Sequence, residues 1–311
     1  MRKFPPIPLS GAIVVITGGA RGIGLATAGL FASKGARVVI GDLTADAAAS
    51  AAQTLGSKAF GYPVDVGDKA SYQRLIDAVE REVGPIDVLV NNAGIMPVGG
   101  LLDEDDAVAV ATFNVNYWAH YHALKIIAPR MMARGRGHIV NVTSAAGKLH
   151  SPGLGSYVAA KHAATGLSRC AREELMASGI SVTAVLPWAV RTQLVDGIPF
   201  NAWERMGIVS PTRIARTIVG TLGRRPALVG GPPGLLTALN LAAHVPEPLW
   251  LLGRRWTNAD RVMGPIDRDS RKEYDDRITM QTATALTSAT APVIAPGTSE
   301  DSHDRHRPDQ R

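Results

Sequence analysis

Short runs of β-branched residues alternate with longer helical patterns along most of the chain, and this alternation restricts the fold more than any other feature. The runs at 13–16 and 38–40 are apolar without alternation, which is typical of strands covered by helices on both faces. The rhythm predicts a parallel sheet with crossover helices. Strands are expected at 12–17, 37–42, 59–64, 86–90, 137–142, 180–186 and near 227–229, and helices at 22–33, 45–55, 69–83, 112–134, 156–178 and 211–222.

The expected fold is therefore α/β, with a single doubly wound domain in residues 1–230 whose sheet and helices fill about 10–230. Residues 231–277 form an apolar C-terminal extension without a second domain. Residues 278–311 are rich in Thr, Ala, Ser and Pro and lack periodicity, so they cannot bury enough surface to offset the entropy of ordering. We predict a disordered tail from residue 278.

The composition argues against several classes of function. The 33 Lys and Arg residues are scattered among 27 acidic ones, which gives no support for nucleic-acid binding. The single cysteine, Cys170, rules out an intrachain disulfide and a cysteine-based zinc site, so a cytoplasmic location is expected. We expect Cys170 to be buried and inert. His120 and His122 lie two apart and cannot share a helix face, so we expect surface or subunit-contact positions and no metal site.

A glycine-rich segment joins the first strand to the first helix. The segment reads Thr17-Gly18-Gly19-Ala20-Arg21-Gly22-Ile23-Gly24, and three of its four glycines lie where the backbone must turn tightly and approach a pyrophosphate. The helix N-terminus supplies free N–H groups and a positive dipole end for that anion. The alternative is a tight turn without a ligand. Since a strand precedes the loop and a helix and an acid follow it, dinucleotide binding is the better interpretation.

The acid is Asp42, eighteen positions past Gly24 at the end of the second strand. A carboxylate there accepts hydrogen bonds from the adenosine ribose and repels a 2′-phosphate, which favours NAD over NADP. Arg21 argues the other way, because a basic residue in the loop can hold a phosphate. The alternative role for Asp42 is helix capping.

Three polar residues are expected to converge at the carboxyl ends of the strands. Tyr157 and Lys161 lie four apart near the start of a helix, so they share a face. Ser144 follows the strand at 137–142, and this edge is where parallel sheets place their sites. A hydroxyl, a phenol and an ammonium are then available to one ligand.

These motifs, in this order, resemble those of the short-chain dehydrogenase/reductase family over about residues 10–230, which implies a Rossmann fold. The glycine segment is similar to the family's TGxxxGIG loop, and Asn91-Asn92-Ala93-Gly94 to its NNAG turn. The resemblance implies catalysis by Asn116, Ser144, Tyr157 and Lys161, and cofactor contacts from Gly18, Arg21, Gly22, Ile23, Gly24, Asp42, Asp65, Val66, Asn92, Ala93, Gly94, Tyr157, Lys161, Val190 and Thr192.

The sequence departs from the family after the strand at 180–186. The family usually reads Pro-Gly-x-Val-x-Thr, whereas this chain has Trp188 in place of the glycine, with Val190 and Thr192 still in position to meet the nicotinamide carboxamide. The indole points into the substrate pocket or packs against a neighbouring loop. Residues 193–210 occupy the place of the family's substrate lid and are apolar, which favours a hydrophobic substrate, or else they cover the core.

The resemblance implies an NAD-dependent oxidoreductase that interconverts a hydrophobic alcohol and its carbonyl, with Tyr157 as general base or acid, and a homodimer or homotetramer. The alternatives are an NADPH-dependent carbonyl reductase and a non-catalytic cofactor-binding scaffold. Peripheral membrane contact is a further alternative to a dimer contact or lid extension. It would use the leucines of 235–252 with Arg205, Arg213, Arg216, Arg224 and Arg225.

Overall fold

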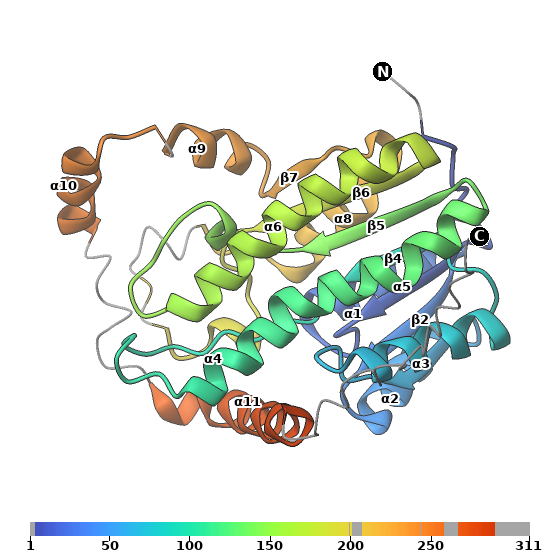
Figure 1. Ribbon diagram of the computed structural model, residues 1–311, viewed down its shortest axis with the longest axis horizontal. Coiled ribbons are helices and arrows are strands. Elements are labelled where there is room, and N and C mark those ends of the chain that lie inside the picture. Colours follow the sequence, from blue (N-terminus) through green and yellow to red (C-terminus); the bar gives the residue numbers. More distant parts are fainter. Residues whose placement is uncertain (1–3, 199, 201–206, 243, 258–266, 290–311) are drawn as a thin grey trace, which may run out of the picture.

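In the computed structural model, which describes residues 4–198, 200, 207–242, 244–257 and 267–289, seven parallel strands form one twisted sheet (Figure 1). Its order is β3-β2-β1-β4-β5-β6-β7, which confirms the doubly wound α/β prediction. The strands are β1 (Ile13–Thr17), β2 (Arg37–Asp42), β3 (Ala59–Pro63), β4 (Val88–Asn91), β5 (Gly137–Val142), β6 (Ile180–Pro187) and β7 (Leu228–Gly231). The order reverses between β1 and β4, so a crevice opens at their carboxyl ends.

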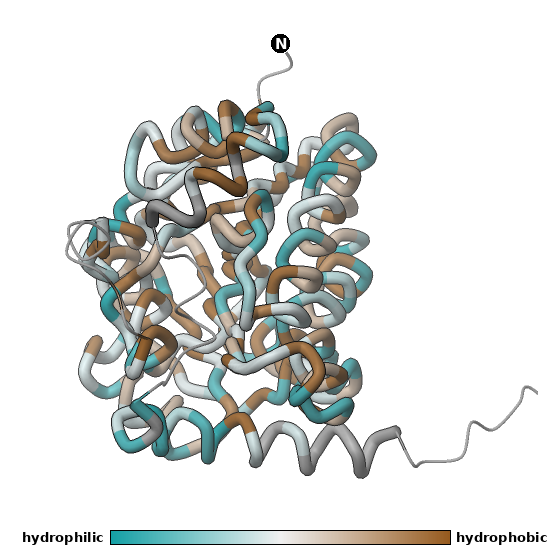
Figure 2. The backbone as a smooth tube through the Cα atoms, turned by 90° about the vertical axis from the view of Figure 1, so that its left-hand side faces the viewer, coloured by the Kyte–Doolittle hydropathy of each residue, from teal (hydrophilic) through white to brown (hydrophobic). Residues whose placement is uncertain are grey.

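Helices cover both faces of the sheet, and each face has its own apolar core. In β1, Ile13 and Val15 belong to one core and Val14 and Ile16 to the other, as the period of two in a strand requires. One face carries α1 (Gly22–Ser33), α2 (Ala45–Leu55) and α8 (Pro211–Arg224), and the other carries α3 (Lys69–Glu82), α5 (Ala119–Ala133) and α6 (Gly155–Leu175). Figure 2 shows hydrophobic stretches through the interior and mixed colours along the outer helices.

Local signals explain where several helices begin. Thr44, Asp68 and Ser210 accept hydrogen bonds from the first free N–H groups of α2, α3 and α8. The helix predicted at 112–134 begins earlier, with α4 (Asp106–Phe113), because Asp105 caps it. A π-helical turn, η1 (Asn114–Trp118), then separates α4 from α5.

The chain beyond β7 forms three further helices among the described residues: α9 (Leu235–Ala242), α10 (Glu247–Thr257) and α11 (Arg268–Ala289). Helix α11 returns to the domain and lies along α4 (Figure 1). Residue 278, where the disordered tail was expected to begin, lies inside α11, and Tyr274 and Ile278 are buried against the main core. Residues 290–311 lie outside the described part. No helix in the described ranges is long and apolar enough to cross a membrane.

Three expectations for single residues were wrong. Cys170 is exposed, because the buried face of α6 is formed by Ala164, Ser168 and Ala171. His120 lies on the buried face of α5 and not on the surface. Arg225 is also buried and donates to the Pro5 carbonyl at 2.7 Å, so it is not part of an exposed basic surface.

Candidate active site

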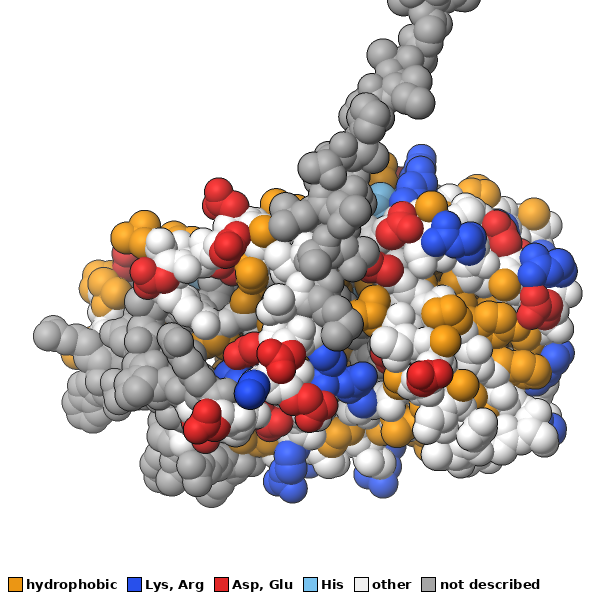
Figure 3. Space-filling view, turned by 90° about the horizontal axis from the view of Figure 1, so that it is seen from below, with side chains coloured by type: hydrophobic (Ala, Val, Ile, Leu, Met, Phe, Trp, Pro, Cys, Tyr) orange, Lys and Arg blue, Asp and Glu red, His pale blue; other side chains and the backbone are white. Residues whose placement is uncertain are grey.

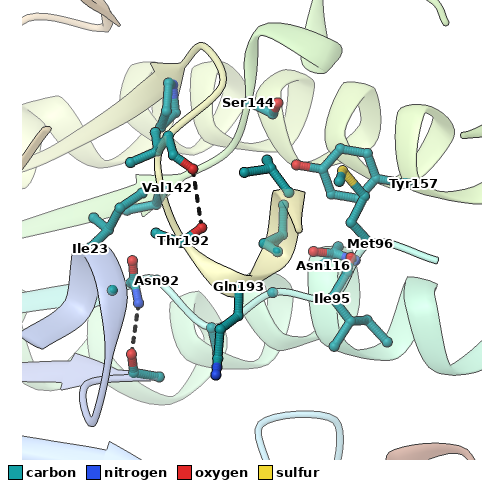
Figure 4. Close-up of a pocket in the computed structure, with 18 of the residues that line it drawn as sticks. Ile23, Asn92, Ile95, Met96, Asn116, Val142, Ser144, Tyr157, Thr192 and Gln193 are labelled. Atoms are coloured by element: carbon teal, nitrogen blue, oxygen red, sulfur yellow. Dashed lines mark hydrogen bonds between the residues drawn. The ribbon is translucent and has the colours of Figure 1, made fainter. Parts of the chain in front are cut away.

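A cavity of about 1600 Å³ opens at the carboxyl ends of the strands, on both sides of the point where the strand order reverses. Figure 4 shows Ser144, Tyr157 and Asn116 on one side of this space and Ile23 and Asn92 on the other. The predicted site residues that line the cavity are Gly18, Arg21, Gly22, Ile23, Asp42, Val66, Asn92, Ala93, Gly94, Asn116, Ser144, Tyr157, Lys161, Val190 and Thr192. Residues far apart in the sequence therefore meet in one space.

The glycine loop is held to β4 by the side chain of Asn92. Its amide nitrogen donates to the carbonyls of Thr17 and Gly18, each at 3.0 Å. A Cβ atom on Gly24 would collide with the Gly18 carbonyl oxygen, and one on Gly18 would lie 2.8 Å from the Cα of Ala93. Gly24 does not line the cavity, so its role is to let α1 and the loop approach each other.

The start of α1 is free to receive an anion. No side chain caps this helix at Arg21, so its first N–H groups face the cavity without a side-chain acceptor. Asp42 is fixed beside them, since its two oxygens accept from the N–H groups of Ala20 and Leu43, both at 2.9 Å. The Arg21 guanidinium lies 4.0 Å from the Asp42 carboxylate. The residue expected to favour NADP therefore forms an ion pair with the residue expected to favour NAD.

Ser144, Tyr157 and Lys161 come together where β5 ends and α6 begins. The hydroxyls of Ser144 and Tyr157 face the same space (Figure 4). Burial raises the pKa of Tyr157, and the Ser144 hydrogen bond opposes this rise. The Lys161 ammonium donates to the Val142 carbonyl at 3.2 Å and lies 5.7 Å from the centre of the Tyr157 ring. Burial lowers the pKa of Lys161 to about 7.

Asn116 lies in η1, and the wide π-helical turn directs its side chain toward Lys161. Its amide nitrogen donates to the carbonyls of Ile95 and Thr112, at 2.7 and 3.0 Å. Its side-chain oxygen is buried and has no hydrogen-bond partner in the described part of the chain. A Cβ on Gly94 would lie 2.9 Å from that oxygen and 3.4 Å from the Lys161 nitrogen, so both groups border the same small space.

The segment after β6 lines the cavity and lies against the glycine loop. A Cβ on Gly22 would lie 3.1 Å from the Thr192 methyl group, which places Thr192 against this loop. Val190 forms a bridge with Val209. Trp188 lines the cavity and also packs against the small core formed by Ala145, Ala184, Leu186 and Leu239. Of the expected lid, η4 (Gln193–Val195), Ile198 and Phe200 are described, whereas Pro199, Trp203 and Met206 lie outside the described residues.

Asp65, which was expected to contact the cofactor, lies outside the cavity lining. Its carboxylate accepts from the N–H of Gly67 at 2.9 Å. Burial raises the pKa of Asp65. The neighbouring Val66 does line the cavity.

Several residues near the site were not predicted to lie there. His120 lies one helical turn after Asn116; burial and the charge of Lys161 lower its pKa to about 3, so it is neutral at pH 7. Its Nδ1 atom is buried and finds no hydrogen-bond partner among the residues that the structure describes. Tyr274, Arg277 and Ile278 of α11 line the cavity from the far end of the chain. The only possible signal for α11 was a helical spacing of Tyr274 and Ile278 within a highly polar stretch.

Known proteins share this architecture. Residues 12–201 match the family model for short chain dehydrogenases. The chain is 33% identical over 219 residues to the 3-oxoacyl-(acyl-carrier-protein) reductase FabG of Thermotoga maritima, covering 70% of this chain and 86% of the relative. It is 30% identical to 17-beta-hydroxysteroid dehydrogenase 13 of Rattus norvegicus, covering 77% and 81%, and 32% identical to epidermal retinol dehydrogenase 2 of Mus musculus, covering 69% and 72%.

Solved structures agree with the sequence comparison. A short chain dehydrogenase/reductase from Burkholderia phymatum in complex with NAD superimposes with a TM-score of 0.68 at 26% identity, covering 79% of this chain and 96% of the other. Another protein of the short chain dehydrogenase/reductase family gives a TM-score of 0.64 at 32% identity, covering 72% and 97%. From the family model, the relatives and the shared fold, the chain belongs to the short-chain dehydrogenase/reductase family of NAD(P)-dependent oxidoreductases.

Proposed function

We propose that the protein is an NAD-dependent oxidoreductase that interconverts a hydrophobic alcohol and its carbonyl compound. The observation that carries this proposal is the meeting of Ser144, Tyr157 and Lys161 in the same cavity as the glycine loop. A structural or purely cofactor-binding protein has no need of a phenol, a hydroxyl and a buried ammonium at the far end of a dinucleotide cavity.

The residues present fit a dinucleotide cofactor. The uncapped start of α1 suits the pyrophosphate, and the glycines of the loop leave the backbone open to it. The Asp42 carboxylate suits the adenosine ribose, and Val190 and Thr192 suit the nicotinamide carboxamide. The unpartnered oxygen of Asn116 suits a water molecule that links Lys161 to solvent.

The proposed mechanism follows from the positions of the protons. In the oxidative direction the Tyr157 oxygen takes the hydroxyl proton of the substrate, and the bound nicotinamide supplies the hydride acceptor. Burial alone disfavours the phenolate, so the Ser144 hydrogen bond and a protonated Lys161 are needed to stabilise it. Ser144 also donates to the substrate oxygen where charge develops, and Lys161 holds the nicotinamide ribose. In the reductive direction Tyr157 donates the proton.

A hydrophobic substrate is supported by the apolar side chains that line the cavity. They include Leu149, Leu154, Trp188, Ile198, Phe200, Val245 and Leu249. The relatives' names include a hydroxysteroid and a retinol dehydrogenase, whose substrates are large and apolar.

Replacing Trp188 by Ala is expected to raise the KM for a bulky apolar alcohol about 10-fold, because its contact area is lost, and to leave the KM for NAD unchanged. Steady-state kinetics with each substrate varied in turn measures both values, and an equal rise in both would remove Trp188 from the substrate site.

The cofactor preference gives the second experiment. Asp42→Ala is expected to lower NADH affinity about 10- to 100-fold, because the ribose loses a charged acceptor. The same change releases Arg21 from its ion pair and removes the repulsion of a 2′-phosphate, so NADPH affinity rises. Fluorescence titration of both cofactors measures the two effects. Asp46→Ala, which removes an exposed carboxylate near the start of α2, is the matched control.

The alternative, an NADPH-dependent carbonyl reductase, makes the opposite prediction for the wild-type protein. A preference for NADPH that Asp42→Ala leaves unaltered would assign the discrimination to Arg21, and the NAD proposal would then be wrong.

We also propose a cytoplasmic location, because the chain has a single cysteine, and a homo-oligomer, because the chain resembles the family. Light scattering measures the oligomeric state, and a monomer would contradict the second proposal.

A further inference from the structure

Helix α11 contacts two loops that frame the active-site cavity. We call residues 92–100, after β4, the β4 loop, and residues 188–198, after β6, the β6 loop. The side chain of Arg271 is only 2% exposed, and its guanidinium donates to three carbonyls. They belong to Leu194 and Asp196 in the β6 loop, at 3.3 and 3.0 Å, and to Met96 in the β4 loop, at 3.0 Å. One side chain therefore joins both loops.

A second residue of α11 holds the β4 loop at the same place. The Tyr274 hydroxyl accepts a hydrogen bond from the N–H of Met96 at 2.8 Å. Its ring lies 4.9 Å from the Arg271 guanidinium and lines the cavity. Both backbone polar groups of Met96 are thus bound by α11, which fixes the orientation of this peptide segment.

The β6 loop also lies directly against α11. A Cβ atom on Gly197 would lie 2.7 Å from the Cγ of Arg271, so only glycine permits this approach. At the start of η4, the Gln193 side-chain oxygen accepts a hydrogen bond from the Arg277 guanidinium at 2.8 Å. Leu194 follows Thr192 by two residues, so the clamped segment begins beside the residue that lies against the glycine loop.

The clamp also reaches Asn116 through one peptide. The Ile95 carbonyl, which accepts from the Asn116 amide, belongs to the peptide bond that contains the Met96 N–H. Tyr274 and Asn116 therefore hold opposite sides of the same peptide group. A guanidinium is suited to the other contacts because it offers five donors in a planar fork, whereas a lysine ammonium is a single point on a flexible stem.

We propose that Arg271 and Tyr274 are positioning residues, and that α11 is a clamp that fixes the β4 and β6 loops around the reacting groups. The clamp holds the Ile95–Met96 peptide that orients Asn116, and it holds η4 beside Thr192. This inference rests on the proposed function for its kinetic consequence but not for its structural one. The outer face of α11 carries interspersed acidic and basic side chains (Figure 3), so only its inner face takes part.

Hydrogen exchange of the full-length protein without cofactor tests the structural part. Arg271→Ala is expected to raise exchange in peptides from both loops, whose contacted residues Met96 and Leu194 are 98 positions apart in the chain, because the three carbonyls lose their donor and the loops separate from α11. Tyr274→Phe removes only the acceptor for the Met96 N–H, so exchange rises roughly 5-fold in the β4 loop and is unchanged in the β6 loop. Lys272→Ala, an exposed neighbour on the same helix, leaves both loops unchanged.

The kinetic part uses the same variants. Arg271→Ala is expected to lower kcat/KM about 100-fold, as misplaced reacting groups do, with NADH binding weakened by less than kcat/KM. If exchange in both loops is unchanged in Arg271→Ala, or rises only within α11, the clamp is wrong. If exchange rises in both loops and kcat/KM equals that of Lys272→Ala, the positioning role is wrong. A wild-type protein without oxidoreductase activity would instead contradict the proposed function, and the exchange result would still decide the clamp. Should Arg271→Ala fail to fold, Tyr274→Phe tests the contact with the β4 loop by exchange and by kcat/KM, and unchanged exchange in that loop would contradict the clamp.

Discussion

Replacing Tyr157 by Phe is expected to lower kcat by about 10²- to 10⁴-fold while the affinity for NADH stays within about twofold of the wild-type value. The phenol oxygen is the only atom removed, and it is the atom proposed to take and return the substrate proton. The ring remains, so the packing of Tyr157 at the start of α6 is preserved. The loss therefore belongs to proton transfer and not to the shape of the cavity.

Steady-state turnover with a bulky apolar alcohol and NAD, together with NADH titration, measures the two quantities. Tyr121→Phe is the matched control, because Tyr121 lies on α5 and does not line the cavity. Lost turnover with intact NADH binding supports an enzyme. A variant that turns over at the wild-type rate would exclude Tyr157 as the acid or base, and an unchanged cellular role without turnover would favour the scaffold.

The central sheet could be predicted because its signal is local. Strands β1 and β2 are covered on both faces, so their centres, 13–16 and 38–40, appear in the sequence as continuous apolar runs, and the predicted bounds of β2 agree with the structure. The prediction was weaker where a polar side chain, not periodicity, decides a boundary. Asp105 caps α4 well before the apolar pattern becomes regular, which is why the helix predicted at 112 starts at Asp106.

Much of the candidate site could be anticipated, because motifs mark the ends of strands. What the sequence did not reveal depends on long-range contacts. Nothing near residue 271 indicates that Arg271 is buried, since its acceptors lie about 75 and 175 positions away. The π-helical turn at Asn116 likewise has no residue signature, and His120 is buried only because its helix packs against α6 and the sheet. A polar helix such as α11 is therefore easily taken for a disordered tail.

The second large effect concerns the free energy of unfolding, because a lysine that turnover requires is costly to bury. Lys161 is buried, and its ammonium has one hydrogen bond among the described residues, to the Val142 carbonyl. Burial lowers its pKa from 10.5 to about 7. Between these values the unfolded chain binds more protons than the folded one, so the free energy of unfolding rises with pH from about 7 to about 10.5. One pKa unit corresponds to about 1.4 kcal/mol, so the rise is at most about 5 kcal/mol.

Lys161→Met is therefore expected to abolish turnover and to stabilise the cofactor-free protein by several kcal/mol at pH 6, because methionine fills the same space without a charge to desolvate. The difference from wild type shrinks as pH rises and is lost near pH 10.5, where a neutral amine carries no such cost. Urea denaturation followed by circular dichroism at pH 6, 8 and 10 measures this convergence, with Lys125→Met, an exposed lysine on α5, as the control. A variant less stable than wild type at pH 6 would mean that the Val142 hydrogen bond outweighs desolvation, and that Lys161 is held charged by the fold itself.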